Sequence, residues 1–435
     1  MEVIPLGTTI FTKGVWLLVP GILCVLLSAP VRAEVQTLSL PQIIEYSLQN
    51  NGDLKSFREE KGIRDAGKMK AGLLPNPTLE FDGGTGAMTG NSSDSSLSLG
   101  VSQEFLLAGK RGKRLAIAEG EMEMYFWQLA DKERLLAGET KSAFYELIVA
   151  EKRLALSEDF ISLNRTLLQV TRERLEAGEI PELEMNLAKV ELARSAGKKL
   201  AIEKDLRQNR TKILHLMGLP LDEDPVLTGS LESARSLTKE LAQLQRLAQE
   251  NRPDIKALEA EKSKGGAEII LARTEGIPNL TAGLSVKHDT TSSVVDGTND
   301  SSNIIGLKLS MPIPLFDHNQ AGVQDAQSKR NSAETRLSAA IKAIEREVET
   351  AYAGFVNAES ILAMYRTDIL PQLEENLKLT QEAYRLGEVG ILTVIEEQKK
   401  YFEVNDGYLT ALYDRQTALS KLETSVATDI TGGVQ

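Results

Sequence analysis

The sequence predicts a mostly α-helical chain with transmembrane β-strands, in which long helices form a barrel and several chains pool their strands. Three observations lead to this fold class. The chain repeats itself after about 200 residues, and each repeat holds an apolar heptad pattern too long for an ordinary globular helix. Four short segments alternate polar and apolar residues, as half-buried strands do. Only 5% of the 435 residues are aromatic, which also favours long helices over a compact β core.

Composition excludes several classes of function. The net charge of −12 argues against a general affinity for nucleic acid. One cysteine and three histidines (His215, His288 and His318) cannot build a disulfide framework or a structural zinc site. The sequence has no glycine-rich phosphate loop between strand and helix and no nucleophile–base pair. We therefore expect a protein that is not an enzyme and has no metal site and no cofactor.

Residues 1–33 have the composition of a secretory signal peptide. Lys13 precedes an apolar run from Val15 to Leu27, and the small residue Ala33 fits cleavage directly after it. The run is too short and too interrupted to anchor the chain as a membrane-spanning helix. No later stretch approaches about 18 apolar residues, so a mature chain that enters a membrane must do so as strands.

Two repeats follow the signal peptide. The segment Leu175–Ile180, for example, recurs as the segment Tyr384–Val389. We expect a first repeat over residues 34–225 and a second over residues 226–435. Each repeat reads as a helix, a hairpin, a very long helix and a final helix, so the length of the chain reflects duplication rather than three domains.

The very long helices are expected from about Lys110 to Ala177 and from about Gln320 to Leu386, each on the order of 100 Å. Apolar residues form two heptad stripes on nearly opposite sides of the first, and the second repeats them with Gln372 as the one polar exception. Such a helix needs a neighbour on each side, as in a cylinder of helices; an antiparallel bundle with broad cores is the alternative. Pro371 should kink the second helix. The stripes of the first helix are Leu147, Leu154, Ile161, Leu168, Leu175 and Val149, Leu156, Leu163, Val170, Ala177. The stripes of the second helix are Val356, Ala363, Leu370, Leu377, Tyr384 and Ala358, Tyr365, Gln372, Leu379, Leu386.

The alternating segments are expected as strands at residues 78–82, 96–102, 279–287 and 306–311, and the residues between the members of each pair as loops. The strands approach the length of tilted transmembrane strands, with polar residues on one side. Four strands cannot close a barrel, so several chains must combine, and three chains of four strands would give a trimeric 12-stranded β-barrel. Alternation alone leaves open a pair of soluble, half-buried hairpins.

Two motifs resemble the strand-to-helix junctions of the TolC family of outer-membrane efflux channels, most closely its CzcC-like (cobalt–zinc–cadmium resistance) branch. These motifs are Gln103–Arg111 and Met311–Gln320, and Leu38–Asn51 is similar to the family's first helix. The resemblance covers essentially all of the mature chain. It implies a homotrimer with a β-barrel in outer-membrane lipid and a helical tunnel in the periplasm. It also implies two partners, a periplasmic adaptor and an inner-membrane pump of the resistance-nodulation-division type.

The turns around Gly178 and Gly387 resemble the family's periplasmic tips, where the adaptor binds. A glycine at the end of a long helix also permits the left-handed turn with which the chain reverses. The resemblance assigns adaptor contact to both glycines and to the residues that follow them, Glu179 and Glu388.

The resemblance assigns the constriction of the tip to Glu184, Thr393 and Glu396, of which Thr393 departs from the acidic pattern. A threefold ring of carboxylates would concentrate cations at the narrow end. A solvated helix face is the alternative for each of these residues.

At the strand-to-helix junctions, Gly109 and Lys110 begin the first long helix, and Pro312 and Pro314 precede the second. The prolines remove backbone donors and force extended geometry, so we assign them a structural role only. The basic cluster Lys110–Arg114 is either solvated or placed to meet anionic lipid head groups.

The leading hypothesis is therefore an outer-membrane channel that passively conducts divalent metal cations or small toxic compounds. Two alternatives remain, the exit duct of a type I protein secretion system and a periplasmic coiled-coil scaffold without a pore. The strands argue against the scaffold, which has no need of lipid-facing apolar residues.

Overall fold

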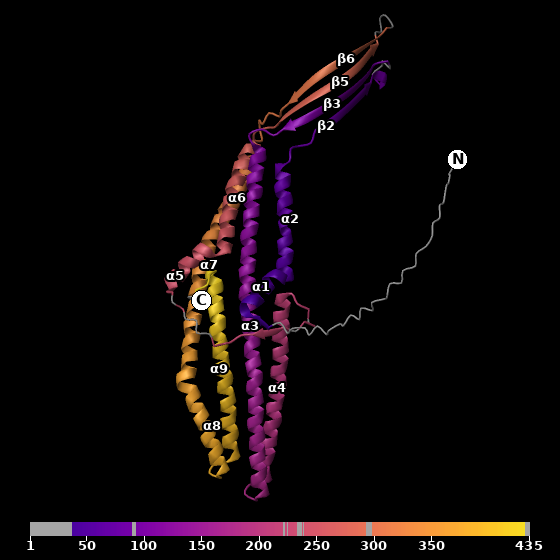
Figure 1. Ribbon diagram of the computed structural model, residues 1–435. Coiled ribbons are helices and arrows are strands. Elements are labelled where there is room, and N and C mark those ends of the chain that lie inside the picture. Colours follow the sequence, from indigo (N-terminus) through magenta and orange to yellow (C-terminus); the bar gives the residue numbers. More distant parts are fainter. Residues whose placement is uncertain are drawn as a thin grey trace, which may run out of the picture.

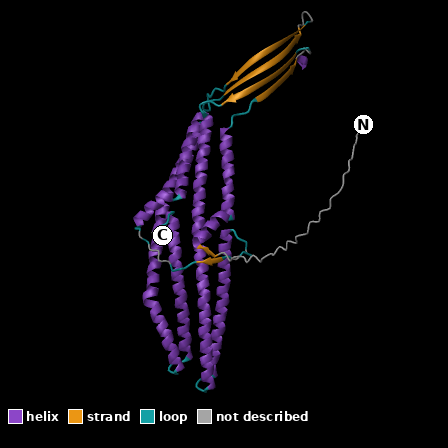
Figure 2. Cartoon of the chain, viewed as in Figure 1, coloured by secondary structure: helices purple, strands orange, loops and turns teal. Residues whose placement is uncertain are grey.

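The computed structural model describes residues 37–88, 93–220, 222–223, 225–232, 237, 239–292 and 298–430; the expected signal peptide lies outside the described residues. A long helical body carries a β-sheet at one end and two helical tips at the other (Figures 1 and 2). The first half comprises β1 (Thr37–Ser39), α1 (Leu40–Asn50), α2 (Gly52–Gly72), β2 (Thr78–Thr85), the short turn η1 (Gly86–Met88), β3 (Ser95–Phe105), α3 (Lys110–Glu176) and α4 (Glu182–Met217). The second half comprises β4 (Val226–Thr228), α5 (Leu241–Asn251), α6 (Pro253–Glu275), β5 (Leu280–Ser292), β6 (Asn299–Ser310), α7 (Gln320–Met364), the π-helical segment η2 (Tyr365–Ile369), α8 (Leu370–Arg385) and α9 (Ile391–Val426).

The two long helices differ in continuity. α3 is one helix of 67 residues, as predicted. Its counterpart is α7 and α8 in succession, interrupted by the π-helical η2 directly before Pro371, where the sequence predicts a kink. Proline has no N–H to donate to the preceding turn, and the wider π-helical turn accommodates that loss.

The helices lie side by side in a single curved layer rather than in a closed bundle. Towards the tips, α3 packs against α4 on one side and α9 on the other, and α8 continues the layer beyond α9. Towards the sheet, the order is α7, α6, α3 and α2. The prediction that α3 has a neighbour on each of two opposed faces is thus confirmed.

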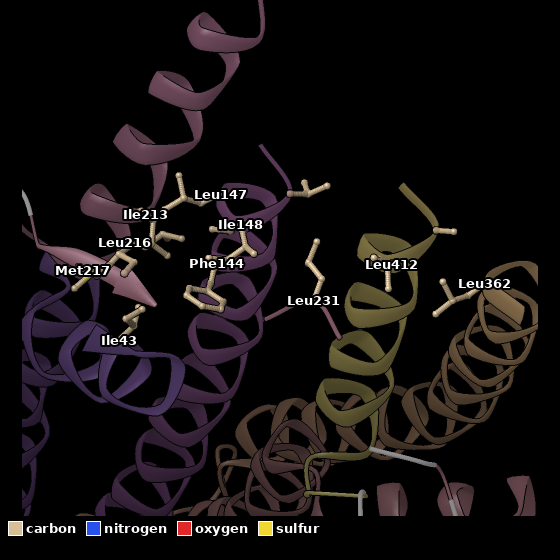
Figure 3. Close-up of a cluster of buried hydrophobic side chains, with 14 residues drawn as sticks. Ile43, Phe144, Leu147, Ile148, Ile213, Leu216, Met217, Leu231, Leu362 and Leu412 are labelled. Atoms are coloured by element: carbon tan, nitrogen blue, oxygen red, sulfur yellow. The ribbon is translucent and has the colours of Figure 1, made fainter. Parts of the chain in front are cut away.

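A belt of short elements crosses this layer at mid-height. The parallel pair of β1 and β4 lies here with α1 and α5. The hydrophobic core of the belt joins α1, α3, α4, α7 and α9 (Figure 3). Its largest members include Ile43, Phe144, Leu147, Ile148, Ile213, Leu216, Met217, Leu231, Leu362 and Leu412.

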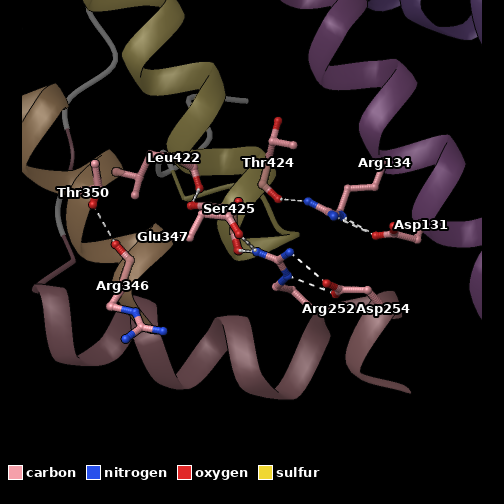
Figure 4. A network of polar contacts seen from close by, with 10 residues as sticks. All are labelled: Asp131, Arg134, Arg252, Asp254, Arg346, Glu347, Thr350, Leu422, Thr424 and Ser425. Atoms are coloured by element: carbon pink, nitrogen blue, oxygen red, sulfur yellow. Dashed lines mark hydrogen bonds and ion pairs between the residues drawn. The ribbon is translucent and has the colours of Figure 1, made fainter. Parts of the chain in front are cut away.

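At this level the first helical stretch of each half is broken by a polar joint. In the first half, Asn51 accepts a hydrogen bond from the N–H of Leu54 at 3.1 Å and donates one to the carbonyl of Leu216, near the end of α4, at 3.1 Å. In the second half, Arg252 takes this place and donates to the carbonyl of Ser425, near the end of α9, at 3.2 Å (Figure 4).

The sheet has the strand order β2-β3-β5-β6 and is antiparallel throughout. Its strands are longer than predicted, because residues expected in loops, such as Gly83–Thr85 and Asn299–Ser302, continue the ladders. Ladder hydrogen bonds come from the backbone, so polar side chains do not end them. Within the described residues, the outer edges of β2 and β6 pair with no further strand.

Among the described residues, no helix combines the length and the apolar character that crossing a membrane requires.

Candidate functional site

Each helical tip reverses through a glycine in the left-handed region. Gly178, between α3 and α4, has φ +76°, and Gly387, between α8 and α9, has φ +81°. The N–H of Glu179 donates to the carbonyl of Arg174 at 3.0 Å, and that of Glu388 to the carbonyl of Ala383 at 2.8 Å. Both turns therefore close the last helical carbonyls in the manner of a Schellman cap. A side chain other than glycine at either φ would strain the turn.

The two tips are tied together by Thr171, Arg174, Glu184 and Tyr384, which we call the tip clasp. The Tyr384 hydroxyl donates to Glu184 at 3.1 Å and lies 3.4 Å from the Thr171 hydroxyl. The Arg174 guanidinium donates to the carbonyl of Tyr384 at 2.8 Å and stacks over the Tyr384 ring at 4.9 Å. Tyr384 is 2% exposed, and burial raises the pKa of its phenol. The clasp thus joins α3 and α4 to α8 through a buried tyrosine.

Apolar and charged contacts extend this connection away from the tips. Phe160 of α3 packs on Phe402 of α9 with ring centroids 4.9 Å apart, and the Lys198 ammonium lies 3.6 Å from the Phe402 ring. Lys399 of α9 pairs with Glu191 of α4 at 3.0 Å. The two helical hairpins therefore pack against each other over a long stretch below the belt.

The predicted constriction residues do not form one group within a single chain. Glu184 belongs to the tip clasp, whereas Thr393 and Glu396 are exposed in the first turns of α9. Three residues apart, they lie on a similar side of α9, and the neighbouring Ile391, Val394 and Ile395 are buried. Of the predicted adaptor contacts, Glu179 pairs with Arg174 at 3.1 Å, and Glu388 is exposed.

A groove of about 780 Å³ lies between α3, α7 and α9. Charged residues in its lining include Glu139, Glu146, Asp414 and Lys421. Glu146 also pairs with Lys212 of α4 at 2.7 Å. The lining combines these charged residues with small and apolar ones such as Gly138, Ala351 and Ile361.

The sheet has one apolar and one polar face, as the alternation predicts. On the polar face, serine, glycine and threonine surround the charged residues Glu80, Asp82, Lys287, Asp289 and Lys308. The apolar side chains are between 51% and 82% exposed in the single chain. They are Leu79, Phe81, Leu97, Leu99, Val101, Leu284, Val286, Ile305, Leu307 and Leu309.

The first strand-to-helix junction is fixed by buried polar contacts. Gly109 is left-handed at φ +68°, and Lys110 is 4% exposed. The Lys110 ammonium donates to the carbonyl of Ile277 at 2.5 Å and to Asn279 at 2.7 Å, and burial lowers its pKa.

The other basic residues of this cluster also bind within the chain. Arg111 donates to the carbonyl of Gly72, Lys113 to Thr274, and Arg114 pairs with Glu275. These contacts hold the cluster within the chain, and the suggestion that it meets lipid head groups stays a prediction.

The second junction is longer and apolar. Pro312 and Pro314 lie in an extended linker between β6 and α7, and Ile313 and Phe316 are largely exposed. His318 lies in this linker and donates its backbone N–H to Gln320 at 2.8 Å. Within the described residues, no group of three or more His, Cys, Asp or Glu side chains is arranged to hold a metal ion.

The sequence pattern of a known family, described as "Outer membrane efflux protein", matches residues 43–219 and 244–428. The chain belongs to this family. Proteins of the family are passive channels of the outer membrane, so the expectation that the chain is not an enzyme is confirmed, and the alternative of a scaffold without a pore is wrong. The resemblance to TolC-type channels is likewise confirmed.

Individual relatives refine this picture. The cobalt-zinc-cadmium resistance protein CzcC of Cupriavidus metallidurans is 22% identical over 394 residues, covering 90% of this chain and 91% of the relative. Among solved structures, CusC matches with a TM-score of 0.76 at 18% identity, covering 90% of this chain and 92% of that one. The open-state MtrE outer membrane channel of Neisseria gonorrhoeae matches with a TM-score of 0.72 at 18% identity, covering 91% and 90% of the two chains. The channel thus shares the fold of these proteins.

Sequence reasoning found the tip glycines and Glu184 but missed Thr171, Arg174 and Tyr384. Tyr384 lies on a predicted heptad stripe, where it reads as a core residue. Its hydroxyl was the one sign of a further role, because a tyrosine hydroxyl at a buried position needs a hydrogen-bond partner.

Proposed function

We propose that three copies of this channel close side by side into one continuous duct, a twelve-stranded β-barrel in the outer membrane above a helical tunnel in the periplasm. The observation that carries the proposal is that the chain has two unsatisfied flanks. One flank is formed by β6, α7 and α8, and the other by β2, α2 and α4. Contact of one flank with the other on the next chain is heterologous, and such contacts form a ring when the rotation closes.

Exposed apolar residues support this closure. Leu379 of α8 is 60% exposed and Leu386, directly after α8, is 66% exposed, and both lie on one predicted heptad stripe. On α4, Leu183 and Val190 are 66% and 54% exposed. Heptad stripes of this kind bury themselves against a second helix, so α8 of one chain fits α4 of the next.

The sheet supports closure in the membrane. Unpaired backbone N–H and C=O groups at its edges are costly in lipid, where only a closed barrel gives every strand hydrogen-bond partners on both sides. The 13 residues of β5 extend roughly 44 Å, and a tilt of about 45° reduces this length to the roughly 30 Å of a hydrocarbon core. The apolar face would then contact lipid and the polar face would line the lumen.

We infer that the duct carries divalent metal cations or small toxic compounds, because CzcC is a metal-resistance protein by name. By analogy with the family, a pump of the resistance-nodulation-division type supplies the energy and an adaptor binds the tips around Gly178, Glu179, Gly387 and Glu388. A protein-secretion duct would have the same architecture, and the metal-resistance relative favours the smaller cargo.

Three further assignments belong to this proposal. The chain begins with a signal peptide over residues 1–33, cleaved on export, and consists of efflux repeats over residues 34–225 and 226–435. Glu184, Thr393 and Glu396 surround the tip constriction in the trimer. The tip clasp holds α8 against α3 and α4 within the chain, and we propose that this contact narrows the tip of the trimer.

The first test is the single-channel current of the protein purified from outer membranes and reconstituted in a planar bilayer. We expect discrete, cation-preferring conductance, reduced or reshaped in Glu396→Gln. A protein found only in soluble periplasmic extracts, with no conductance, would contradict the proposal.

The trimer has a separate test. Leu386→Glu places a charge in the proposed contact with α4 of the next chain. Because Leu386 is exposed in the single chain, the change should not disturb the fold of that chain. We expect loss of the trimer in native mass spectrometry with helix content unchanged. Met88→Glu is the matched control, because Met88 is 97% exposed and lies at the far end of the β2–β3 hairpin.

A further inference from the structure

The polar face of the sheet contains an ion pair between its two outermost strands. The Lys308 ammonium of β6 lies 3.1 Å from a carboxylate oxygen of Glu80 on β2. The other carboxylate oxygen of Glu80 accepts a hydrogen bond from the Ser102 hydroxyl of β3 at 2.8 Å. Two strands, β3 and β5, separate the partners, so the pair crosses the whole width of the sheet.

The residues beneath this pair explain how it can form. Gly283 of β5 stands opposite Lys308, and Gly100 of β3 stands opposite Glu80. Neither has a side chain to obstruct the pair, and a Cβ on Gly283 would meet the Cβ of Ser102 at 3.1 Å. Small residues on one face also let a sheet curve towards that face, as a narrow barrel requires.

The pair lies on the face that the proposed barrel turns to its lumen. Leu79 and Phe81 flank Glu80 in the sequence, and Leu307 and Leu309 flank Lys308; all four belong to the apolar face. Because strand residues alternate between faces, both charges must point away from the lipid. The Lys308 and Glu80 side chains are 60% and 35% exposed, so water reaches them.

We propose that the three Lys308–Glu80 pairs of the trimer form a charge-balanced ring in the barrel lumen, which sets the ion preference of the barrel separately from the tip. This inference rests on the proposed trimeric duct. Rings of charged side chains select ions in pores. In this ring each carboxylate is neutralised by an ammonium group, so cations are neither concentrated nor held there. A metal cation released at the tip would pass this ring without a second binding step.

The test is the reversal potential of single channels in a salt gradient, measured for the full chain in wild-type and Tyr384→Phe backgrounds, so that a closed tip cannot mask the barrel. Lys308→Gln leaves three uncompensated carboxylates, and Glu80→Gln leaves three uncompensated ammonium groups. We expect the cation-to-anion permeability ratio to rise in the first and fall in the second, each by about fivefold. The double variant should return close to the starting ratio.

The matched control is Arg246→Gln. This change removes one positive charge from the exposed face of α5, whose opposite face packs Leu244 and Ala248 into the belt. Equal ratios in all conducting variants, or shifts in the same direction for both single variants, would overturn the ring while leaving the duct intact. A wild-type protein that forms no trimer and no channel would overturn the proposed duct, and the ring with it.

Discussion

The two long helices of this channel occupy equivalent places but differ in rigidity. α3 runs without interruption and has α4 and α9 along its sides. Its counterpart breaks at η2 into α7 and α8, and the α8 stripe around Leu379 and Leu386 is exposed. When Gly178 is aligned with Gly387, Pro371 corresponds to Ser162 of α3. A serine therefore stands in the uninterrupted helix at the position where a proline follows the π-helical break in its counterpart.

Of the four tip helices, α8 has the weakest attachment to the first half, whereas α9 packs along α3. Below η2, α8 is attached to the first half mainly through Tyr384 of the tip clasp. At the level of η2, Gly407 of α9 makes room for the Tyr365 hydroxyl, which any larger residue would meet. A π-helical turn opposite a glycine is a place where a helix bends at low cost.

The largest effect is expected where the halves differ in charge, at the belt joints. Arg252 is 5% exposed and pairs with Asp254 at 2.8 Å and Glu347 at 2.7 Å. Arg252→Ala leaves both carboxylates without this partner, but they are 33% and 44% exposed, so we expect the free energy of unfolding to fall by about 3 kcal/mol. Asn51→Ala, which removes the neutral joint of the first half, should cost only about 1 kcal/mol.

Thermal unfolding in detergent, followed by circular dichroism, measures both changes. Equal losses for the two variants would mean that charge makes no difference to the joint.

The next effect tests continuity by exchanging the two aligned residues. Ser162→Pro removes a hydrogen bond from the interior of α3 and should destabilise the chain by about 3 kcal/mol. Pro371→Ala should restore regular α-helical bonding and slow amide hydrogen exchange over Tyr365–Ile369 by about tenfold, or ~1.4 kcal/mol. Unchanged exchange in Pro371→Ala would show that packing against Gly407, rather than the proline, produces the π-helical turn.

Much of the difference between the two long helices could be predicted from the sequence, because it depends on residues that are close together in the chain. The duplicated segments, the glycine turns, the heptad stripes of α3 and the break at Pro371 all follow from residue periodicity and backbone chemistry. The strands were placed correctly but too short, because backbone pairing continued through polar residues.

Contacts between distant segments could not be predicted in the same way. Tyr384 meets Glu184 across 200 residues, and Lys308 meets Glu80 across 228. No periodicity encodes which charge or hydroxyl faces which across such separations. The pair of β1 and β4 and the polar joints at Asn51 and Arg252 were missed for the same reason, since each depends on how the halves pack.

A smaller effect is expected from the tip clasp. Tyr384→Phe keeps the ring under Arg174 but removes the hydroxyl that binds Glu184 and Thr171. A hydrogen bond to a charged group contributes about 1.5–3 kcal/mol, so we expect the open probability of single channels to rise by about tenfold. Tyr401→Phe, on α9 and outside the clasp, is the matched control and should leave gating unchanged. An open probability that rises equally in both variants would mean that the clasp does not control opening.

The smallest effect concerns carboxyl groups on the two continuous helices α3 and α9. Partial burial raises the pKa of Glu151 on α3 and of Asp414 on α9, although both residues keep exposed surface. The folded chain therefore holds these protons more tightly than the unfolded chain, so the stability that they confer is present at acid pH and is lost as the pH rises through the raised pKa values. Glu151→Gln and Asp414→Asn should each raise the unfolding midpoint slightly at pH 7 and leave it unchanged near pH 3.

Burial and the neighbouring Glu146 also raise the pKa of Tyr413 to about 12, so its phenolate absorbance should appear only well above pH 10. A Tyr413 that ionises near pH 10 would mean that water fills the groove between α3 and α9, and Asp414→Asn, at a residue that also lines the groove, should then show no gain.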